Sequence, residues 1–389
     1  MAKGQPAEEP TVARGLEGVI VTEHSLSFID GENGILEYKG YPIQDLATGA
    51  SYEEVVYLLW HGHLPTPSEL EPFSQELASN RSLPEEAMAL LRACPPDAPP
   101  MSALRTVVSR LGLLDPDAED GSDEANLRKA TRLVAQFSSI AAAFHRLRQG
   151  LDPVPPRQDL GHAANFLFML HGEESRPEHI AALNAYYVLT ADHGMNASTF
   201  TARVIASTDS DLHSAVTGAI GALKGPAHGG APNRVMEMFQ EIGAADRAEP
   251  WLRAELDAGR RIMGLGHRVY KTLDPRATVL HRMTEELSAL SDEPQWLAIA
   301  EATEDAAVAL LQEKKPEQRL YTNVEFYTAT TLYYVGIPSD YYASMFACSR
   351  IAGWTAHLME QYADNRLIRP RARYAGPRGQ TFTPLSERG

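Results

Sequence analysis

Three short segments each place a side chain that can move a proton among glycines or other small residues. GPAHGGA carries His228, GLGHRVYK carries His267, and NVEFYTA carries Glu325. Glycine allows the backbone to approach a bound molecule closely. Two imidazoles and one carboxylate are sufficient to remove a carbon-bound proton and to protonate a carbonyl oxygen. The segments therefore predict acid–base chemistry. His228 taken alone would favour a histidine packed in a turn, whereas its place in GPAHGGA favours a functional residue.

Other chemistries find less support in the sequence. The glycines before His267 do not predict a nucleotide-binding loop, because a third glycine is absent and no strand precedes them. His61 and His63 are spaced like metal ligands, but no third ligand lies nearby, and we interpret them as surface residues. The sequence Gly-x-Ser-x-Gly is absent, so a serine hydrolase has no nucleophile elbow. We expect no metal in the chemistry.

The elements that must position these side chains are mostly helices. Ser51 to Glu54 has the form of a capping box before an apolar run, and a helical stripe from Leu212 to Leu223 stops at Gly225-Pro226. A new helix is expected near Pro232.

The clearest β signal is a hairpin between Leu26 and Tyr38. Residues 94–100 are rich in proline and predict a loop, and the acidic residues 115–124 predict an exposed turn. Periodicity alone predicts an all-α protein with this small hairpin.

The ordered set of motifs resembles citrate synthase. The resemblance extends from GLEGVIVTEHSLSFIDGENGILEYKGYPIQDLA near the start to RIAGWTAHLMEQYADNRLIRPRARYAGP near the end. It implies a large helical domain of residues 1–225 and 331–389, and a smaller inserted helical domain of residues 226–330. The active site is expected in the cleft between them, and the family forms homodimers.

The resemblance also implies roles for the three proton-transfer residues. His228 would stabilise the enol of acetyl-CoA, and His267 would contact the ketone of oxaloacetate and help to protonate it. Glu325 would be the general base. The family motif normally carries aspartate here, and glutamate has one methylene more, so either the local backbone is adjusted to glutamate or the enzyme is slower.

Further residues match substrate contacts of the family. Oxaloacetate has two carboxylates, for which guanidinium groups are natural partners. The matching positions are His193, Arg276, Arg350 and Arg369, the last reaching across from the partner subunit. Contacts to coenzyme A are expected from Leu265, Gly266, Arg268 and Lys271. The coenzyme A thioester is a substrate, and no cofactor is implied.

Composition limits the remaining classes of function. The net charge of −16 argues against nucleic-acid binding, which needs a basic face. No apolar run reaches membrane-spanning length, and Cys94 and Cys348 predict free thiols, so we expect a cytoplasmic protein. Two alternatives stay open: a 2-methylcitrate synthase that uses propionyl-CoA, and a related dimer that has lost catalysis and binds a partner or metabolite.

Overall fold

The structure, a computed structural model, describes residues 12–229, 231–314 and 320–388. The chain divides into two units. One unit is His24–Arg366, and the other combines Met1–Glu23 with Leu367–Gly389. The described part of the second unit contains two short 3-10 helices, η1 (Arg14–Leu16) and η4 (Leu385–Glu387). All other elements belong to His24–Arg366.

The predicted hairpin is confirmed and gains a third short strand. β1 (Ser27–Asp30), β2 (Ile35–Tyr38) and β3 (Tyr41–Pro42) form one antiparallel sheet. The hairpin turn lies against the segment that follows His267, where a Cβ on Gly31 would be 2.2 Å from the carbonyl oxygen of Val269. The backbone N–H of Lys271 donates to the carbonyl of Gly31 at 2.8 Å. The hairpin therefore supports the loop that carries His267.

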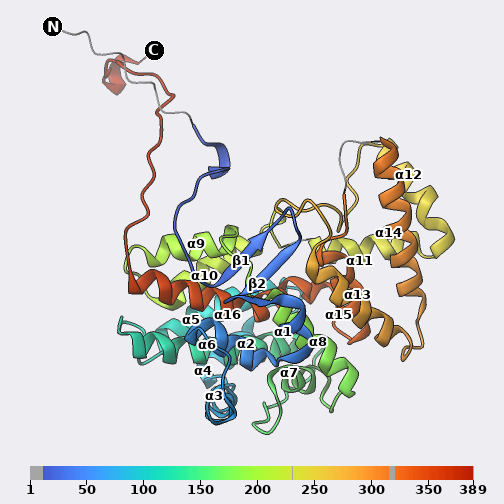
Figure 1. Cartoon of the computed structure of the whole chain (residues 1–389). Coiled ribbons are helices and arrows are strands. Elements are labelled where there is room, and N and C mark those ends of the chain that lie inside the picture. Colours follow the sequence, from blue (N-terminus) through green and yellow to red (C-terminus); the bar gives the residue numbers. More distant parts are fainter. Residues whose placement is uncertain (1–11, 230, 315–319, 389) are drawn as a thin grey trace. The chain divides into compact units, whose positions relative to one another are not determined.

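Most of the unit consists of helices that pack around two long central ones, α6 and α16 (Figure 1). The predicted capping box is present, because the Ser51 and Glu54 side chains each accept from the other's backbone N–H. The helices of this group are α1 (Ile43–Gly49), α2 (Tyr52–His61), α3 (Pro67–Ser79), α4 (Glu85–Ala93), α5 (Pro100–Leu114), α6 (Asp123–Arg148), α7 (His162–His171), α8 (Pro177–Thr190), α9 (Ala197–Ala206), α10 (Leu212–Leu223), η3 (Ser339–Tyr341) and α16 (Tyr342–Ala363).

The remaining helices, yellow to orange in Figure 1, pack extensively against one another. They are α11 (Ala231–Ile242), η2 (Ala245–Arg247), α12 (Ala248–Asp257), α13 (Pro275–Ser288), α14 (Gln295–Lys314) and α15 (Val324–Tyr334). Both α13 and α15 also contact α8. The division into domains at residues 226–330 stays a prediction.

The two predicted loops are present, but one is less exposed than expected. Residues 94–99 connect α4 and α5, as predicted. The turn after α5 buries the side chain of Asp115, which is only 4% exposed. Arg132 on α6 donates two hydrogen bonds to it, and His213 on α10 lies 3.4 Å away. The prediction of an exposed turn is wrong at Asp115, because partners distant in sequence cover it.

Two further predictions concern the whole chain. Cys94 and Cys348 are free, and Cys348 is buried. Among the described residues, the helices are all too short or too polar to cross a membrane. The cytoplasmic location stays a prediction.

Candidate active site

Two predicted histidines and a tyrosine lie together at one end of α8. His193 follows that helix, and its Nε2 lies 3.1 Å from the hydroxyl of Tyr270. The rings of His193 and His267 have centroids 5.5 Å apart. Nδ1 of His267 accepts from the backbone N–H groups of Val269 and Tyr270, at 3.0 and 3.2 Å. In the neutral ring the proton is therefore on Nε2, which can donate to a ligand.

Two buried arginines supply positive charge. Asp274, the N-cap of α13, accepts from Nε and Nη2 of Arg276 at 2.9 and 2.8 Å. Arg350 on α16 donates from Nε to the carbonyl of Thr190 at 2.8 Å, and its guanidinium stacks over Phe346. Burial and the charge of Arg276 lower the pKa of His267 to about 4 and hold the pKa of His193 well below its ordinary value. Both imidazoles are neutral at pH 7.

His228 lies in the connection between α10 and α11 and contacts the first turn of α9. Its Nε2 lies 2.9 Å from Oγ and 3.3 Å from the backbone N–H of Ser198. A backbone N–H can only donate, so Nε2 is the acceptor and Nδ1 carries the proton. Burial, assisted by the charge of Arg350, lowers the pKa of His228 to about 4. The ring is therefore neutral chiefly because it is buried, and the helix that it contacts is α9.

Glu325 is the second residue of α15. Asn323 caps this helix by accepting from the backbone N–H of Glu325. The residue is partly exposed, but its Oε2 is buried without a hydrogen-bond partner in the described structure. Burial, with help from the charge of Asp274, raises the pKa of Glu325 to about 7 despite Arg276 and Arg350. A carboxyl group that titrates near pH 7 can exchange protons in either direction at that pH.

The glycine-rich loop before His267 is joined to the start of α15. Gly264 and Gly266 both have positive φ, at 76° and 77°, which favours glycine. The backbone N–H of Gly266 donates to the carbonyl of Tyr321 at 2.7 Å, and Leu265 forms an isolated bridge with Thr322. Nδ2 of Asn323 donates to the carbonyl of Gly266 at 2.9 Å. These contacts tie the segments of His267 and Glu325 together.

Three of the predicted binding residues are exposed. Arg268 and Lys271 follow His267 and are exposed, although the charge of Lys271 contributes to the lowered pKa of His267. Arg369 belongs to the second unit of the chain, where it is exposed. The predicted roles of these three residues stay predictions.

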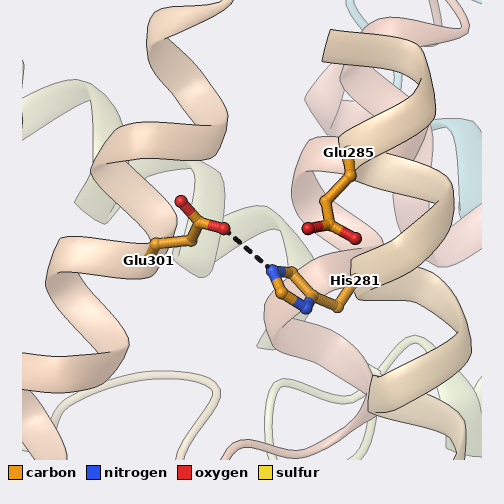
Figure 2. A group of neighbouring side chains, drawn as sticks. All are labelled: His281, Glu285 and Glu301. Atoms are coloured by element: carbon orange, nitrogen blue, oxygen red, sulfur yellow. Dashed lines mark hydrogen bonds and ion pairs between the residues drawn. The ribbon is translucent and has the colours of Figure 1, made fainter. Parts of the chain in front are cut away.

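A separate cluster of titratable groups joins α13 and α14. His281, Glu285 and Glu301 each offer a ligand atom, and these atoms lie within 4.8 Å of one another (Figure 2). One imidazole and two carboxylates are ligand types that Zn²⁺ accepts. However, Nε2 of His281 already contacts Oε1 of Glu301 at 3.0 Å, and Glu285 is exposed. We interpret the group as a polar contact between the two helices, made by His281 and Glu301, and no chemistry of the candidate site depends on it.

Sequence reasoning missed three residues that support the site. Asp274 stands in the same Asp-Pro-Arg segment as Arg276 and also accepts from the backbone N–H of Val324 at 3.1 Å, which joins α13 to α15. Tyr270 belongs to the GLGHRVYK motif, and its position three residues after His267 could have indicated that it lies close to that ring. Ser198 had no signal, because its partner His228 is 30 residues away.

The arrangement defines an enzyme of acid–base chemistry on an anionic substrate. The positive charges of Arg276 and Arg350 act on the pKa of Glu325. One or both of these charges also lower the pKa of each of the three histidines. Neutral imidazole N–H groups can donate to oxygens that gain charge, and a carboxylate can take a proton. This set of groups suits condensation at a carbon next to a carbonyl.

Comparisons with known proteins give the family. The sequence model "Citrate synthase, C-terminal domain" matches residues 15–371. A citrate synthase of Haloferax volcanii is 50% identical, over 96% of this chain and 98% of the relative. Citrate synthase 2 of Bacillus subtilis is 48% identical, over 97% of this chain and all of the relative. A 2-methylcitrate synthase of Mycobacterium tuberculosis is 42% identical, over 95% of this chain and 92% of the relative.

Solved structures agree with the sequence comparison. The citrate synthase of Thermoplasma acidophilum, solved as a ternary complex with carboxymethyl coenzyme A and oxaloacetate, has a TM-score of 0.91. The two chains are 32% identical, and the match covers 97% of this chain and all of the Thermoplasma acidophilum chain. This chain belongs to the citrate synthase family, whose members are transferases that convert an acyl group into an alkyl group on transfer.

Proposed function

We propose that this protein condenses acetyl-CoA with oxaloacetate and hydrolyses the resulting thioester to citrate and coenzyme A. The observation that carries the proposal is a carboxyl group with a pKa of about 7, Glu325, which interacts with two buried guanidiniums whose charges also act on the neutral histidines. A base whose pKa is close to the working pH combines a large deprotonated fraction with useful basicity.

In the first step Glu325 takes a proton from the methyl group of acetyl-CoA. The thioester oxygen gains negative charge as the proton leaves, and Nδ1–H of His228 donates to it. Ser198 supports this role, because it donates to Nε2 and so fixes the proton on the other nitrogen. A neutral donor in a buried site stabilises the enolate without leaving an unpaired charge before the reaction.

In the second step the enol carbon attacks the ketone of oxaloacetate, and Nε2–H of His267 donates to the ketone oxygen. Arg276, Arg350 and His193 hold the carboxylates. The contacts of Arg276 to Asp274 use Nε and Nη2, and Nη1 has no hydrogen-bond partner among the described residues, so it can bind substrate. Arg369 of the partner subunit would complete the set in a homodimer with shared active sites.

Coenzyme A would lie along the loop that precedes α13. Leu265 and Gly266 would contact coenzyme A, and the exposed side chains of Arg268 and Lys271 would contact its phosphates. The Thermoplasma acidophilum citrate synthase, solved with carboxymethyl coenzyme A and oxaloacetate, supports this substrate pair.

A second candidate is 2-methylcitrate synthesis from propionyl-CoA, which the Mycobacterium tuberculosis relative favours. The more similar relatives are citrate synthases, which supports acetyl-CoA as the preferred substrate. One additional methylene changes discrimination by only ~1–3 kcal/mol, so we expect measurable turnover of propionyl-CoA. A dimer without catalysis has less support, because the pKa of Glu325 suits a base.

The test is the release of free coenzyme A from each thioester in the presence of oxaloacetate. We expect acetyl-CoA to give the higher kcat/KM and to require oxaloacetate. A clear preference for propionyl-CoA would assign the chain to 2-methylcitrate synthesis. No release from either thioester would leave a binding protein.

A further inference from the structure

Asp192 stands directly before His193 and is completely buried. Its Oδ2 accepts from Oγ of Ser27 at 2.7 Å and from the backbone N–H of Gly194 at 3.1 Å. Its own backbone N–H donates to the hydroxyl of Tyr38 at 3.0 Å. The residues on both sides of His193 are thus fixed by hydrogen bonds that involve Asp192. The direction of the His193 ring therefore depends on how Asp192 is held.

The other oxygen of Asp192 faces a buried histidine on α16. Nε2 of His357 lies 3.2 Å from Oδ1 of Asp192, and these two buried atoms have no other polar partner among the described residues. Nδ1 of His357 lies 3.1 Å from Nη1 of Arg203 on α9. An arginine can only donate, so Nδ1 is the acceptor and the ring proton is on Nε2, the nitrogen that lies beside Asp192.

The backbone of α16 is adapted to this contact. A Cβ on Gly353 would lie 2.4 Å from the carbonyl oxygen of Ala191 and 2.6 Å from Oδ1 of Asp192. The missing side chain lets the helix approach residues 191–192, and Gly353 donates its N–H to Ala191 at 3.1 Å. His357 lies four residues further on, on the same face of the helix.

Arg203 is fixed in turn at the far end of the chain of contacts. Its Nε donates to Gln361 at 2.9 Å, and Glu360 lies 3.6 Å from Nη1. Both residues belong to the last turns of α16, and Glu360 also accepts from Ser25, before β1. The contacts therefore join α9, α16 and the hairpin to the turn that carries His193.

We infer that Arg203, His357 and Asp192 form a buried chain of polar contacts that positions His193 for oxaloacetate. The inference rests on the proposed function, because it concerns the histidine assigned there to this substrate. None of the three touches the reacting atoms, so they are positioning residues. Loss of the chain should weaken oxaloacetate binding and leave acetyl-CoA binding nearly unchanged, because His228 and Glu325 are held by other contacts.

The test compares His357→Leu, which removes both polar contacts, with His357→Gln, which keeps a donor and an acceptor. We expect His357→Leu to raise KM for oxaloacetate by on the order of 10–100-fold, the scale of a small misplacement in an active site. KM for acetyl-CoA should change by less than ~3-fold, and His357→Gln should recover most of the loss. If His357→Leu does not fold, Asp192→Asn replaces it. Asparagine has the same shape but only one acceptor oxygen, so it cannot serve both the Gly194 N–H and the N–H of His357. It should likewise raise KM for oxaloacetate and leave KM for acetyl-CoA nearly unchanged.

The matched control is His162→Leu. His162 is also buried and hydrogen-bonded, to Ser138 on α6, and its hydrogen bonds and ring contacts within the described part of the chain do not involve residues 191–194. If His357→Leu and Asp192→Asn change KM for oxaloacetate no more than His162→Leu does, the inference is wrong. Calorimetry of oxaloacetate binding to the wild-type protein and to the variants tests the proposed function and the positioning role separately. Failure of the wild type to bind oxaloacetate refutes the proposed function, whereas wild-type binding that the variants leave intact refutes only the positioning role.

Discussion

Replacing Glu325 by glutamine should make the protein more stable at pH 8 while removing its activity. The pKa of Glu325 rises from an ordinary 4.5 to about 7 in the folded protein, chiefly because burial disfavours the carboxylate. Between these values the folded state binds the proton and the unfolded state has released it. Stability from this group is therefore complete below pH 4.5 and is lost as pH rises through 7.

The size of the effect follows from the two pKa values. One pKa unit corresponds to about 1.4 kcal/mol, so the shift penalises the folded state by roughly 3 kcal/mol at pH 8 and by about 1 kcal/mol at pH 5.5. Glutamine has the shape of the protonated acid and carries no such penalty. The stability of Glu325→Gln relative to wild type should increase by about 2 kcal/mol between these two pH values.

The assay is thermal unfolding of both proteins at pH 5.5 and pH 8. Glu178→Gln is the matched control, because Glu178 is also the second residue of a helix, α8, but is exposed. The control should differ from wild type by less than ~0.5 kcal/mol at both pH values. A Glu325→Gln protein that is no more stable than wild type at pH 8 would refute the claim that folding forces a charge into a buried site.

Three further outcomes are expected. Gly353→Ala should lower the free energy of unfolding by about 1–3 kcal/mol, because its Cβ would lie 2.4 Å from the carbonyl oxygen of Ala191. Gly49→Ala in α1 is the control, since a Cβ there would meet no atom within 4 Å, and thermal unfolding of both variants measures the difference. Condensation should be unaffected by EDTA; activity that EDTA abolishes and a divalent ion restores would contradict the mechanism. Mixed dimers of an Arg369 variant and a His228 variant should regain one working site, and mixed dimers that form without activity would exclude sharing of Arg369.

The local elements of the fold could be predicted because their causes are local in sequence. The Ser51–Glu54 box and the Asp30–Gly34 turn are closed by residues within a few positions of each other. Burial of Asp115 could not be predicted in the same way. Its partners Arg132 and His213 come from other helices, and acidic composition alone suggests solvent exposure.

The same distinction applies to the site. Short motifs were enough to select His228, His267 and Glu325 as candidates, but not to predict the tautomer of His228 or the pKa of Glu325. The tautomer of His228 depends on Ser198, and the raised pKa of Glu325 depends on burial and on the charges around it. These are properties of packing between segments that are far apart in the chain. Arg369 stays a prediction from resemblance.

The central claim is that the carboxylate of Glu325 takes the methyl proton of acetyl-CoA. The most direct measurement is the rate of condensation with saturating substrates in Glu325→Gln and Glu325→Asp. Glutamine should lower the rate by at least ~10²-fold, the low end for loss of a general base, with little change in oxaloacetate affinity. Aspartate keeps the base, so it should retain activity well above that of glutamine, and its rate relative to wild type reports whether the local backbone suits glutamate. Condensation near the wild-type rate in Glu325→Gln would contradict the assignment.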